Sequence, residues 1–175
     1  MRHVFFDIET TGFNHAQGDR IVSIGAVAYP DGGLERGTEE IYYQEINPER
    51  EIPERSIEIH GLTAEMLADK PVFAEVADAM LAFVDNAVLY AHNGYAFDFP
   101  FVNAALEYID KPQLEEVIAH SVDTVLLARD IYPGQRNGLD HLIARAGLEG
   151  RGVHSALEDA RLLAQVYKML LREAD

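Results

Sequence analysis

The order of predicted strands and helices indicates an α/β fold in which a mixed sheet is flanked by helices. Strand-like segments cluster before residue 48, helix-like segments dominate after residue 97, and the two types alternate between these points. Early strands followed by alternation are typical of one sheet with helices packed on it. At 175 residues the chain is long enough for one well-formed core, so we expect a single domain spanning residues 1–175.

The predicted strands fall into two groups. Segments 3–10, 20–30 and 40–48 have strand-like composition, and the turn sequence PDGG follows the second. Their short connections favour an antiparallel meander. Residues 87–92 predict a buried strand, and residues 117–123 predict a short last one.

Helices are predicted from apolar residues at helical spacing and from helix-start signals. They are a short helix capped by Thr63, residues 73–85, a helix with Pro100 in its first turn that continues through 102–109, residues 123–132, residues 139–148 and a long helix after Ser155.

Composition restricts the classes of partner and site. Fourteen Lys and Arg against thirty Asp and Glu give a formal net charge of −16, which argues against tight, long-footprint binding of nucleic acid. The absence of cysteine excludes disulfides and thiolate zinc sites, so any metal must be held by oxygen or imidazole. No membrane-length apolar run or signal peptide is visible, and we expect a soluble cytoplasmic protein without membrane contact.

The first strand carries two carboxylates on one face. In VFFDIETTG, side-chain alternation places Asp7 and Glu9 together, roughly 6.6 Å apart along the backbone, with Phe6 and Ile8 on the opposite face. Burying such a pair without compensation costs several kcal/mol. Either this face is solvated or a positive group lies between the two carboxylates.

The start of the final helix predicts a second polar contact. Ser155 and Glu158 form a capping-box pattern, which places His154 and Asp159 at the two positions that a hydrophobic staple brings together. Taken alone, the pair is best explained as a surface contact at a helix end.

A third acidic position, Asp98, precedes the helix that contains Pro100. Capping of that helix is sufficient to explain it. However, it follows the 87–92 strand, which can lie beside the first strand, and sites gather where strand ends meet helix starts.

The order D-x-E, then D, then H-x-x-x-x-D resembles the DEDDh (DnaQ-like) 3′-to-5′ exonuclease family. The three motifs are residues 7–12, residues 93–98, and His154 with Asp159. Similarity also covers HGLT at 60–63, DKPVFAEVAD at 69–78 and PGQRNGLDHL at 133–142, and so spans nearly the whole chain. It is strongest to proofreading subunits of bacterial replicative polymerases. Residues 93–98 have one residue more than that pattern, with HNG and DFP elements closer to Trex-like exonucleases.

The resemblance implies a ribonuclease-H-like fold and metal-dependent hydrolysis of single-stranded or frayed DNA 3′ ends to nucleoside 5′-monophosphates. It also implies two Mg²⁺ or Mn²⁺ ions, which suit oxygen ligands. Asp7, Glu9 and Asp159 would hold one ion, and Asp7 with Asp98 the other. His154 would be the general base, a role that suits imidazole. A divalent ion is then the positive group between Asp7 and Glu9.

Further positions of the family motifs are candidates for substrate binding. Phe97 would pack against the terminal sugar or base, and the loop at 60–63 would lie beside the 3′ nucleotide, although a core phenylalanine and a helix-entry loop are equally compatible readings. The full candidate set is Thr10, Thr11, Gly12, His60, Leu62, Asn93, Phe97 and Arg136. No role is assigned to His3, His15, His92, His120 and His141.

Other functions share the same motifs. An exoribonuclease of the oligoribonuclease or RNase T-like kind would use the same metal site, and a non-catalytic accessory subunit is a further alternative. DNA 3′ ends, RNA and a DNA polymerase are the expected partners, and the oligomeric state is left open. Because the chain ends soon after the final helix, we expect either a trimmed chain or an enzyme that works alone.

Overall fold

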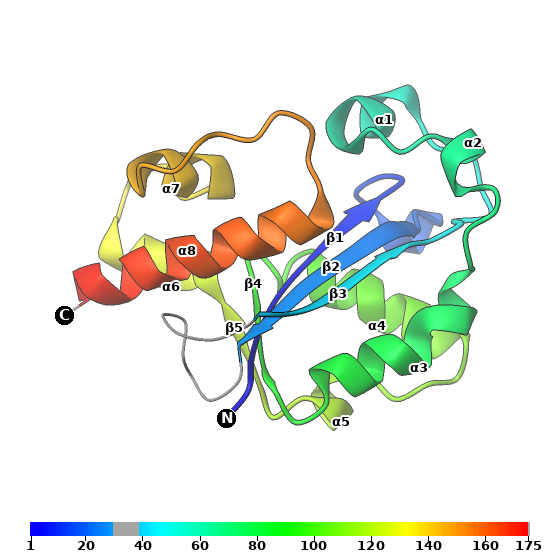
Figure 1. Cartoon of the computed structure of the whole chain (residues 1–175), viewed down its shortest axis with the longest axis horizontal. Coiled ribbons are helices and arrows are strands. Elements are labelled where there is room, and N and C mark those ends of the chain that lie inside the picture. Colours follow the sequence, from blue (N-terminus) through cyan, green and yellow to red (C-terminus); the bar gives the residue numbers. More distant parts are fainter. Residues whose placement is uncertain (30–38, 175) are drawn as a thin grey trace.

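Five strands form one sheet in the order β3-β2-β1-β4-β5 in this computed structural model (Figure 1). The structure describes residues 1–29 and 39–174, so the predicted PDGG turn lies outside the described residues. The strands are β1 (His3–Thr10), β2 (Ile21–Tyr29), β3 (Glu40–Glu45), β4 (Val88–Ala91) and β5 (His120–Asp123).

Strand directions make the sheet mixed, as the sequence predicted. β1 and β2 are antiparallel, as are β2 and β3, which confirms the predicted meander. β1 and β4 are parallel, as are β4 and β5. β4 pairs with the first half of β1, from His3 to Phe5, so the chain leaving the carboxyl end of β4 passes close to Asp7.

Helices fill most of the remaining chain. They are α1 (Glu54–His60), α2 (Ala64–Leu67), α3 (Phe73–Val84), α4 (Asp98–Tyr108), α5 (Leu114–Val117), α6 (Thr124–Ile131), α7 (Leu139–Arg145) and α8 (Ala156–Ala174), with a 3₁₀ turn η1 (His15–Gln17). Thr63 caps α2 as predicted, since its hydroxyl accepts a hydrogen bond from the Met66 N–H at 3.2 Å. Helices α1 and α5 were not predicted, and α5 takes up the start of the segment predicted as the last strand.

The helices cover both faces of the sheet (Figure 1). Phe6 and Ile8 of β1 belong to a buried cluster that includes residues of α3 and α4, whereas Phe5 belongs to a cluster that includes residues of α6, α7 and α8. The alternation of β1 therefore directs its even residues toward α3 and α4 and its odd residues toward α8.

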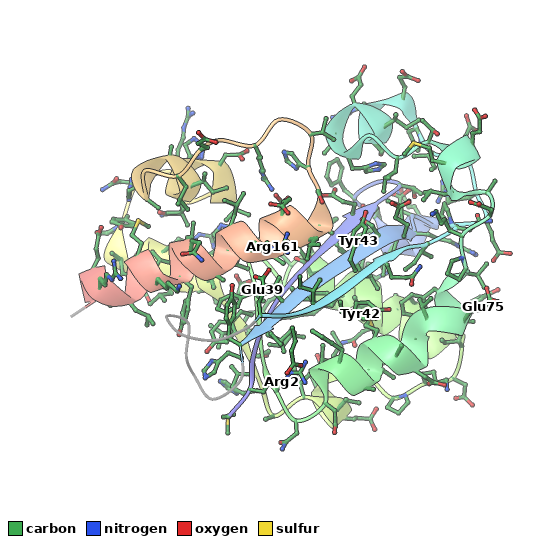
Figure 2. The ribbon with its side chains drawn as sticks, in the orientation of Figure 1. Arg2, Glu39, Tyr42, Tyr43, Glu75 and Arg161 are labelled. Carbon is green, nitrogen blue, oxygen red and sulfur yellow. The ribbon has the colours of Figure 1, made fainter. Side chains whose placement is uncertain are left out.

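Helix α8 is also fastened to the edge of the sheet. Figure 2 shows Arg161 of α8 beside Glu39, which precedes β3, and the guanidinium Nη2 lies 2.8 Å from the carboxylate. A second carboxylate, Glu158 of α8, accepts from the same guanidinium at 2.7 Å. No helix within residues 1–29 and 39–174 is long and apolar enough to cross a membrane.

Candidate active site

The five predicted catalytic residues line one pocket of about 340 Å³ at the carboxyl end of β1. Asp7 and Glu9 come from the strand, Asp98 comes from the start of α4, and His154 and Asp159 come from either side of the start of α8. Three segments distant in sequence therefore meet at one edge of the sheet.

The two carboxylates of β1 face the side of the sheet that α8 covers. Their side chains point the same way as that of Phe5, which packs with residues of α8. The side chain of Ile8 points to the opposite face. Glu9 is only 8% exposed, and Asp7 is partly buried. A solvated face therefore does not explain the pair, and the two carboxylates can be ionised together only if a positive group lies beside them.

Gly25 lets the start of α8 approach the sheet. It lies opposite Asp7 in the β1–β2 ladder, and a Cβ atom on it would lie 2.2 Å from the backbone carbon of Ala156. The first peptide of α8 therefore rests directly on β2, and the first turn brings Asp159 to Glu9. Sequence reasoning missed Gly25, although a glycine inside a strand pattern is a known signal of close backbone approach.

His154 and Asp159 lie near each other, as their staple positions predicted, and Glu9 of β1 lies beside both. One ligand atom from each of these three side chains lies within 4.8 Å of the other two. The N–H of His154 donates to the Ile59 carbonyl at 2.8 Å, which ties the residue before α8 to α1. The imidazole is thereby held beside the carboxylates by its own backbone.

Asp98 is the first residue of α4, with Phe97 at the N-cap position, and not the cap residue itself. Its Oδ1 accepts the N–H of Ile8 at 3.3 Å, and only 3% of the residue is exposed. Asp98 therefore connects α4 directly to β1 next to Asp7.

The crowded carboxylates resist ionisation. Burial, followed by repulsion from Asp98 and Asp159, raises the pKa of Asp7 well above its usual range. Burial and then Asp159 raise the pKa of Glu9 to about 8. Burial raises the pKa of Asp98 to about 7, against the hydrogen bonds from its own N–H and that of Ile8. A cation among these groups would favour their charged forms.

The donors in the pocket fit a divalent metal. Four are carboxylates, the oxygen ligands that hard divalent cations prefer, and the His154 imidazole lies beside them. Oδ1 of Asp159 is buried and has no hydrogen-bond partner, so it is free to coordinate. An unpaired buried carboxylate oxygen is costly unless it has such a use.

Arg151 is a cation in the pocket that sequence reasoning missed. Its guanidinium pairs with Asp159 and, through Nε at 2.8 Å, with Oδ1 of Asp140. The Arg151 side chain is 13% exposed, and its charge opposes the burial that raises the pKa of Asp159. No regular secondary structure marks residues 149–153, so the sequence carried no signal for this contact.

A family model described as an exonuclease matches residues 4–167. The chain belongs to the exonuclease family. The DNA polymerase III subunit epsilon of Rickettsia conorii is 39% identical over 174 residues, 98% of this chain and 74% of that protein. The subunit of the same name from Haemophilus influenzae is 39% identical over 175 residues, 97% of this chain and 67% of that protein. These relatives confirm the DEDDh resemblance and a 3′-to-5′ exonuclease activity.

Solved exonucleases share the fold. Escherichia coli exonuclease I in complex with a dT13 oligonucleotide superimposes with a TM-score of 0.76 at 19% identity, over 97% of this chain and 40% of that one. Exonuclease X in complex with 5′ overhanging duplex DNA superimposes with a TM-score of 0.68 at 25% identity, over 98% of this chain and 90% of that one. The predicted ribonuclease-H-like sheet is thereby confirmed.

Helix α1 of the exonuclease holds the end of β1 in place through His60 and Ser56. His60 is buried, its Nδ1 accepts the Leu62 N–H at 3.1 Å, and its Nε2 lies 3.1 Å from the Thr10 carbonyl. These partners define one neutral tautomer, with the proton on Nε2, and burial lowers the pKa of this imidazole. From the same helix, the Ser56 hydroxyl donates to the Thr11 carbonyl at 2.7 Å.

Some predicted substrate-binding residues line the pocket and others do not. Those that line it are Thr10, Gly12, His60, Asn93 and Phe97. Thr11 is fully buried and donates its hydroxyl to Oδ1 of Asp19 at 3.0 Å, while Leu62 packs in a cluster with Val22. Arg136 is exposed in the loop before α7, outside the pocket lining.

Asp123 fixes the loop that presents Asp98, a role that sequence reasoning missed. Its carboxylate caps α6 through the Val125 N–H at 3.1 Å and accepts the N–H groups of Asn93 at 2.8 Å and Tyr95 at 3.1 Å. Asn93, at the start of this turn, has a left-handed backbone with a φ of 64°. An aspartate between a strand and a helix was the available signal.

His92, which had no assigned role, also lines the pocket. Its Nδ1 lies 2.9 Å from the Thr124 hydroxyl, and its Nε2 donates to the Asn137 carbonyl at 2.7 Å. Burial lowers the pKa of this imidazole. His92 therefore joins the end of β4 to α6 and to the loop before α7.

Proposed function

We propose that this exonuclease removes nucleotides from the 3′ ends of single-stranded or frayed DNA and releases nucleoside 5′-monophosphates, with residues 1–175 acting as one domain. The observation that carries the proposal is the convergence of four carboxylates and one histidine on a single pocket. The relatives named DNA polymerase III subunit epsilon support DNA as the substrate.

Two Mg²⁺ or Mn²⁺ ions would occupy the carboxylate cluster. Asp7, Glu9 and Asp159 would hold one ion, and Asp7 with Asp98 the other. When bound, the pair would stabilise negative charge on the attacking and leaving oxygens. The raised pKa values of Asp7 and Glu9 support this assignment, because like charges this close need a cation to remain ionised together.

His154 is the general base of the proposal. Its imidazole accepts a proton from the attacking water, whose oxygen bonds to phosphorus while the bond from phosphorus to the 3′ oxygen of the preceding nucleotide breaks. The products are a 5′-monophosphate and a strand shortened by one nucleotide. The anchor of His154 to the Ile59 carbonyl supports this role, since a base acts only from a fixed position.

Aromatic side chains at the mouth of the pocket would receive the terminal nucleotide. Phe13 is 71% exposed, and its ring centroid lies 6.2 Å from that of Phe97. Exposed aromatic faces stack on bases without regard to sequence, which a 3′-end exonuclease requires. Asn93, on the same rim, is a further candidate for contact with the nucleotide.

A DNA polymerase is the proposed partner, with this chain as its proofreading exonuclease. The support is the name of the relatives, each a subunit of DNA polymerase III. A non-catalytic accessory role is disfavoured because all five catalytic positions carry the residues that the chemistry needs.

Digestion of matched, 5′-labelled DNA and RNA 12-mers tests the proposal. With Mg²⁺ or Mn²⁺, DNA should shorten one nucleotide at a time from the 3′ end, with mismatched ends faster than paired ends, and the products should be 5′-monophosphates. The Asp7→Asn variant, purified in parallel, is the control for contaminating nucleases. Equal or faster digestion of RNA would reassign the enzyme as an exoribonuclease, and no digestion of either would refute catalysis.

A further inference from the structure

A basic groove lies at the end of α8 that is distant from the active site. Its volume is about 580 Å³, and it is bordered by the end of α7 and the last turns of α8. Three cations, Arg145, Lys168 and Arg172, line it together with one carboxylate, Glu173. Such a cluster is unexpected in a chain whose formal net charge is −16.

Two of these cations are not neutralised by carboxylates. Neither Arg145 nor Lys168 has a carboxylate oxygen within ion-pair distance among residues 1–29 and 39–174. Arg145 instead stacks over the Tyr132 ring, 3.7 Å from its centroid, and donates to Oε1 of Gln135 at 2.5 Å. The stacked geometry fixes the guanidinium in place, so less side-chain entropy is lost when it binds an anion.

The groove's carboxylate, Glu173, is hydrogen-bonded to a tyrosine and not to Arg145 or Lys168. Glu173 accepts the Tyr132 O–H at 2.6 Å. On the opposite face of the sheet, by contrast, Lys111 is paired with Asp78 at 2.6 Å. Lys111 is thus neutralised by a carboxylate, unlike Arg145 and Lys168.

The groove lies on the same helix as the active site. Lys168 follows Asp159 by nine residues, which corresponds to about 14 Å along the axis of α8, and Arg172 lies about 20 Å away. Figure 1 shows α8 running from the carboxyl end of β1 toward the C-terminus, with α7 beside it. The loop before α7 bridges the two regions, because Gln135 binds Arg145 while Asn137 accepts a hydrogen bond from His92 in the pocket.

We propose that this groove binds the phosphodiester backbone of the DNA strand behind the 3′ end that occupies the active site. The proposal rests on the proposed function. At about 3.4 Å per nucleotide in duplex geometry, distances of about 14 to 20 Å correspond to roughly four to six nucleotides from the terminus. An extended single strand would reach the groove with fewer. Arg145 and Lys168 supply the charge that phosphates need on a body that otherwise repels them.

Substitution of Lys168 tests the proposal, because its side chain lies outside the pocket that holds the catalytic residues. Lys168→Gln should raise KM several-fold for a single-stranded 12-mer and leave kcat unchanged. A dinucleotide, too short to reach the groove, should show the wild-type KM. Lys111→Gln removes the same charge on the other face and should change neither value.

Salt dependence gives a second readout. In the Asp7→Asn background at fixed Mg²⁺, Lys168→Gln should flatten the slope of log K against log salt by about 0.7 for a single strand, the value of one lost phosphate contact. An unchanged KM and slope, or the same change from Lys111→Gln, would overturn the proposal. So would a variant that binds DNA normally but loses affinity for poly-glutamate, which would assign the groove to an acidic protein. Failure of the wild type to digest any DNA end would refute the proposed function instead.

Discussion

Gly25 and Asp7 lie directly opposite each other in the β1–β2 ladder. Because Gly25 has no side chain, the backbone at the start of α8 can pack directly against β2 at this position. β1 therefore supplies Asp7, and the glycine of β2 leaves the room that α8 needs to bring Asp159 close to it. The positions of Asp159 and His154 depend on that clearance, because both lie within four residues of the contact at Ala156.

Gly25→Ala should therefore reduce both stability and activity. The added methyl group meets backbone atoms of Ala156 and Leu157, which cannot rotate away, so we expect a loss of about 1–3 kcal/mol in the free energy of unfolding. Because α8 must shift, kcat should fall by more than the loss of folded protein explains. Urea unfolding and single-turnover digestion of a 12-mer measure the two effects.

Gly150→Ala is the matched control, since a Cβ atom there meets no atom within 4 Å. It should leave stability and kcat close to wild type. A Gly25→Ala variant with unchanged kcat would show that α8 can begin elsewhere without moving Asp159.

The sequence predicted the site better than it predicted the surroundings of the site. Alternation in β1 placed Asp7 and Glu9 on one face, and the start of α8 was located well enough to bring His154 beside Asp159, because both rest on local rules, although the Glu158 carboxylate pairs with Arg161. Arg151 was missed because an irregular segment has no periodicity from which to infer a neighbour. Its partners, like the groove beside Lys168, are fixed only by tertiary packing.

The difference between regular elements and irregular segments also explains why some predicted substrate-binding residues do not line the pocket. Family motifs predicted Thr11 and Leu62 by position, but the structure directs the Thr11 hydroxyl to Asp19 and Leu62 into an apolar cluster. Motif position does not reveal side-chain direction in irregular segments, since only helices and strands impose a regular one. The antiparallel meander was predictable because short connections leave few other topologies.

Asp7→Asn should abolish activity without destabilising the metal-free protein. Asp7 is the proposed ligand of both ions, so EDTA-treated wild type and this variant should be equally inactive, and Mg²⁺ or Mn²⁺ should restore only the wild type. The melting temperature of the variant in EDTA should equal or exceed that of wild type, because a carboxylate repelled by Asp98, Asp159 and Glu9 has been removed. A large fall in that temperature would instead identify Asp7 as a structural residue.

The stability of the metal-free protein should fall as pH rises. Glu9 titrates at about 8 in the folded chain against an ordinary value of 4.5, so the native state holds more protons than the unfolded state between these values. The free energy of unfolding therefore decreases through this window and levels off above about pH 8. Melting temperatures in EDTA from pH 5 to 8 should show this trend.

Saturating Mg²⁺ should weaken that pH dependence, because a bound cation favours ionised carboxylates in the folded state. Glu9→Gln should weaken it without metal. If wild type in EDTA becomes more stable from pH 5 to 8, the carboxylates are not repelling one another as the structure indicates.

His154→Ala should lower kcat by about 10²- to 10⁴-fold, the usual contribution of a general base. Metal affinity, measured by calorimetry, should stay close to wild type, since His154 is assigned to proton transfer and not to metal binding. The acidic limb of the pH–rate profile should flatten. His120→Ala, an exposed histidine on β5, should keep wild-type kcat, and full activity of His154→Ala would exclude the proposed base even within an exonuclease of this family.

Arg151 should compete with the metal for Asp159. The guanidinium pairs with a carboxylate that is 2% exposed, and an ion bound by Asp159 would need the same charge. Arg151→Gln should therefore lower the melting temperature in EDTA, because a buried carboxylate loses its partner, and should enlarge the rise in melting temperature on adding Mg²⁺. The control is Arg161→Gln, which removes another guanidinium from α8, one that pairs with Glu39 and Glu158. It should leave the Mg²⁺-induced rise in melting temperature at its wild-type size. A smaller rise in Arg151→Gln than in wild type would mean that Arg151 orients Asp159 for the metal and does not compete with it.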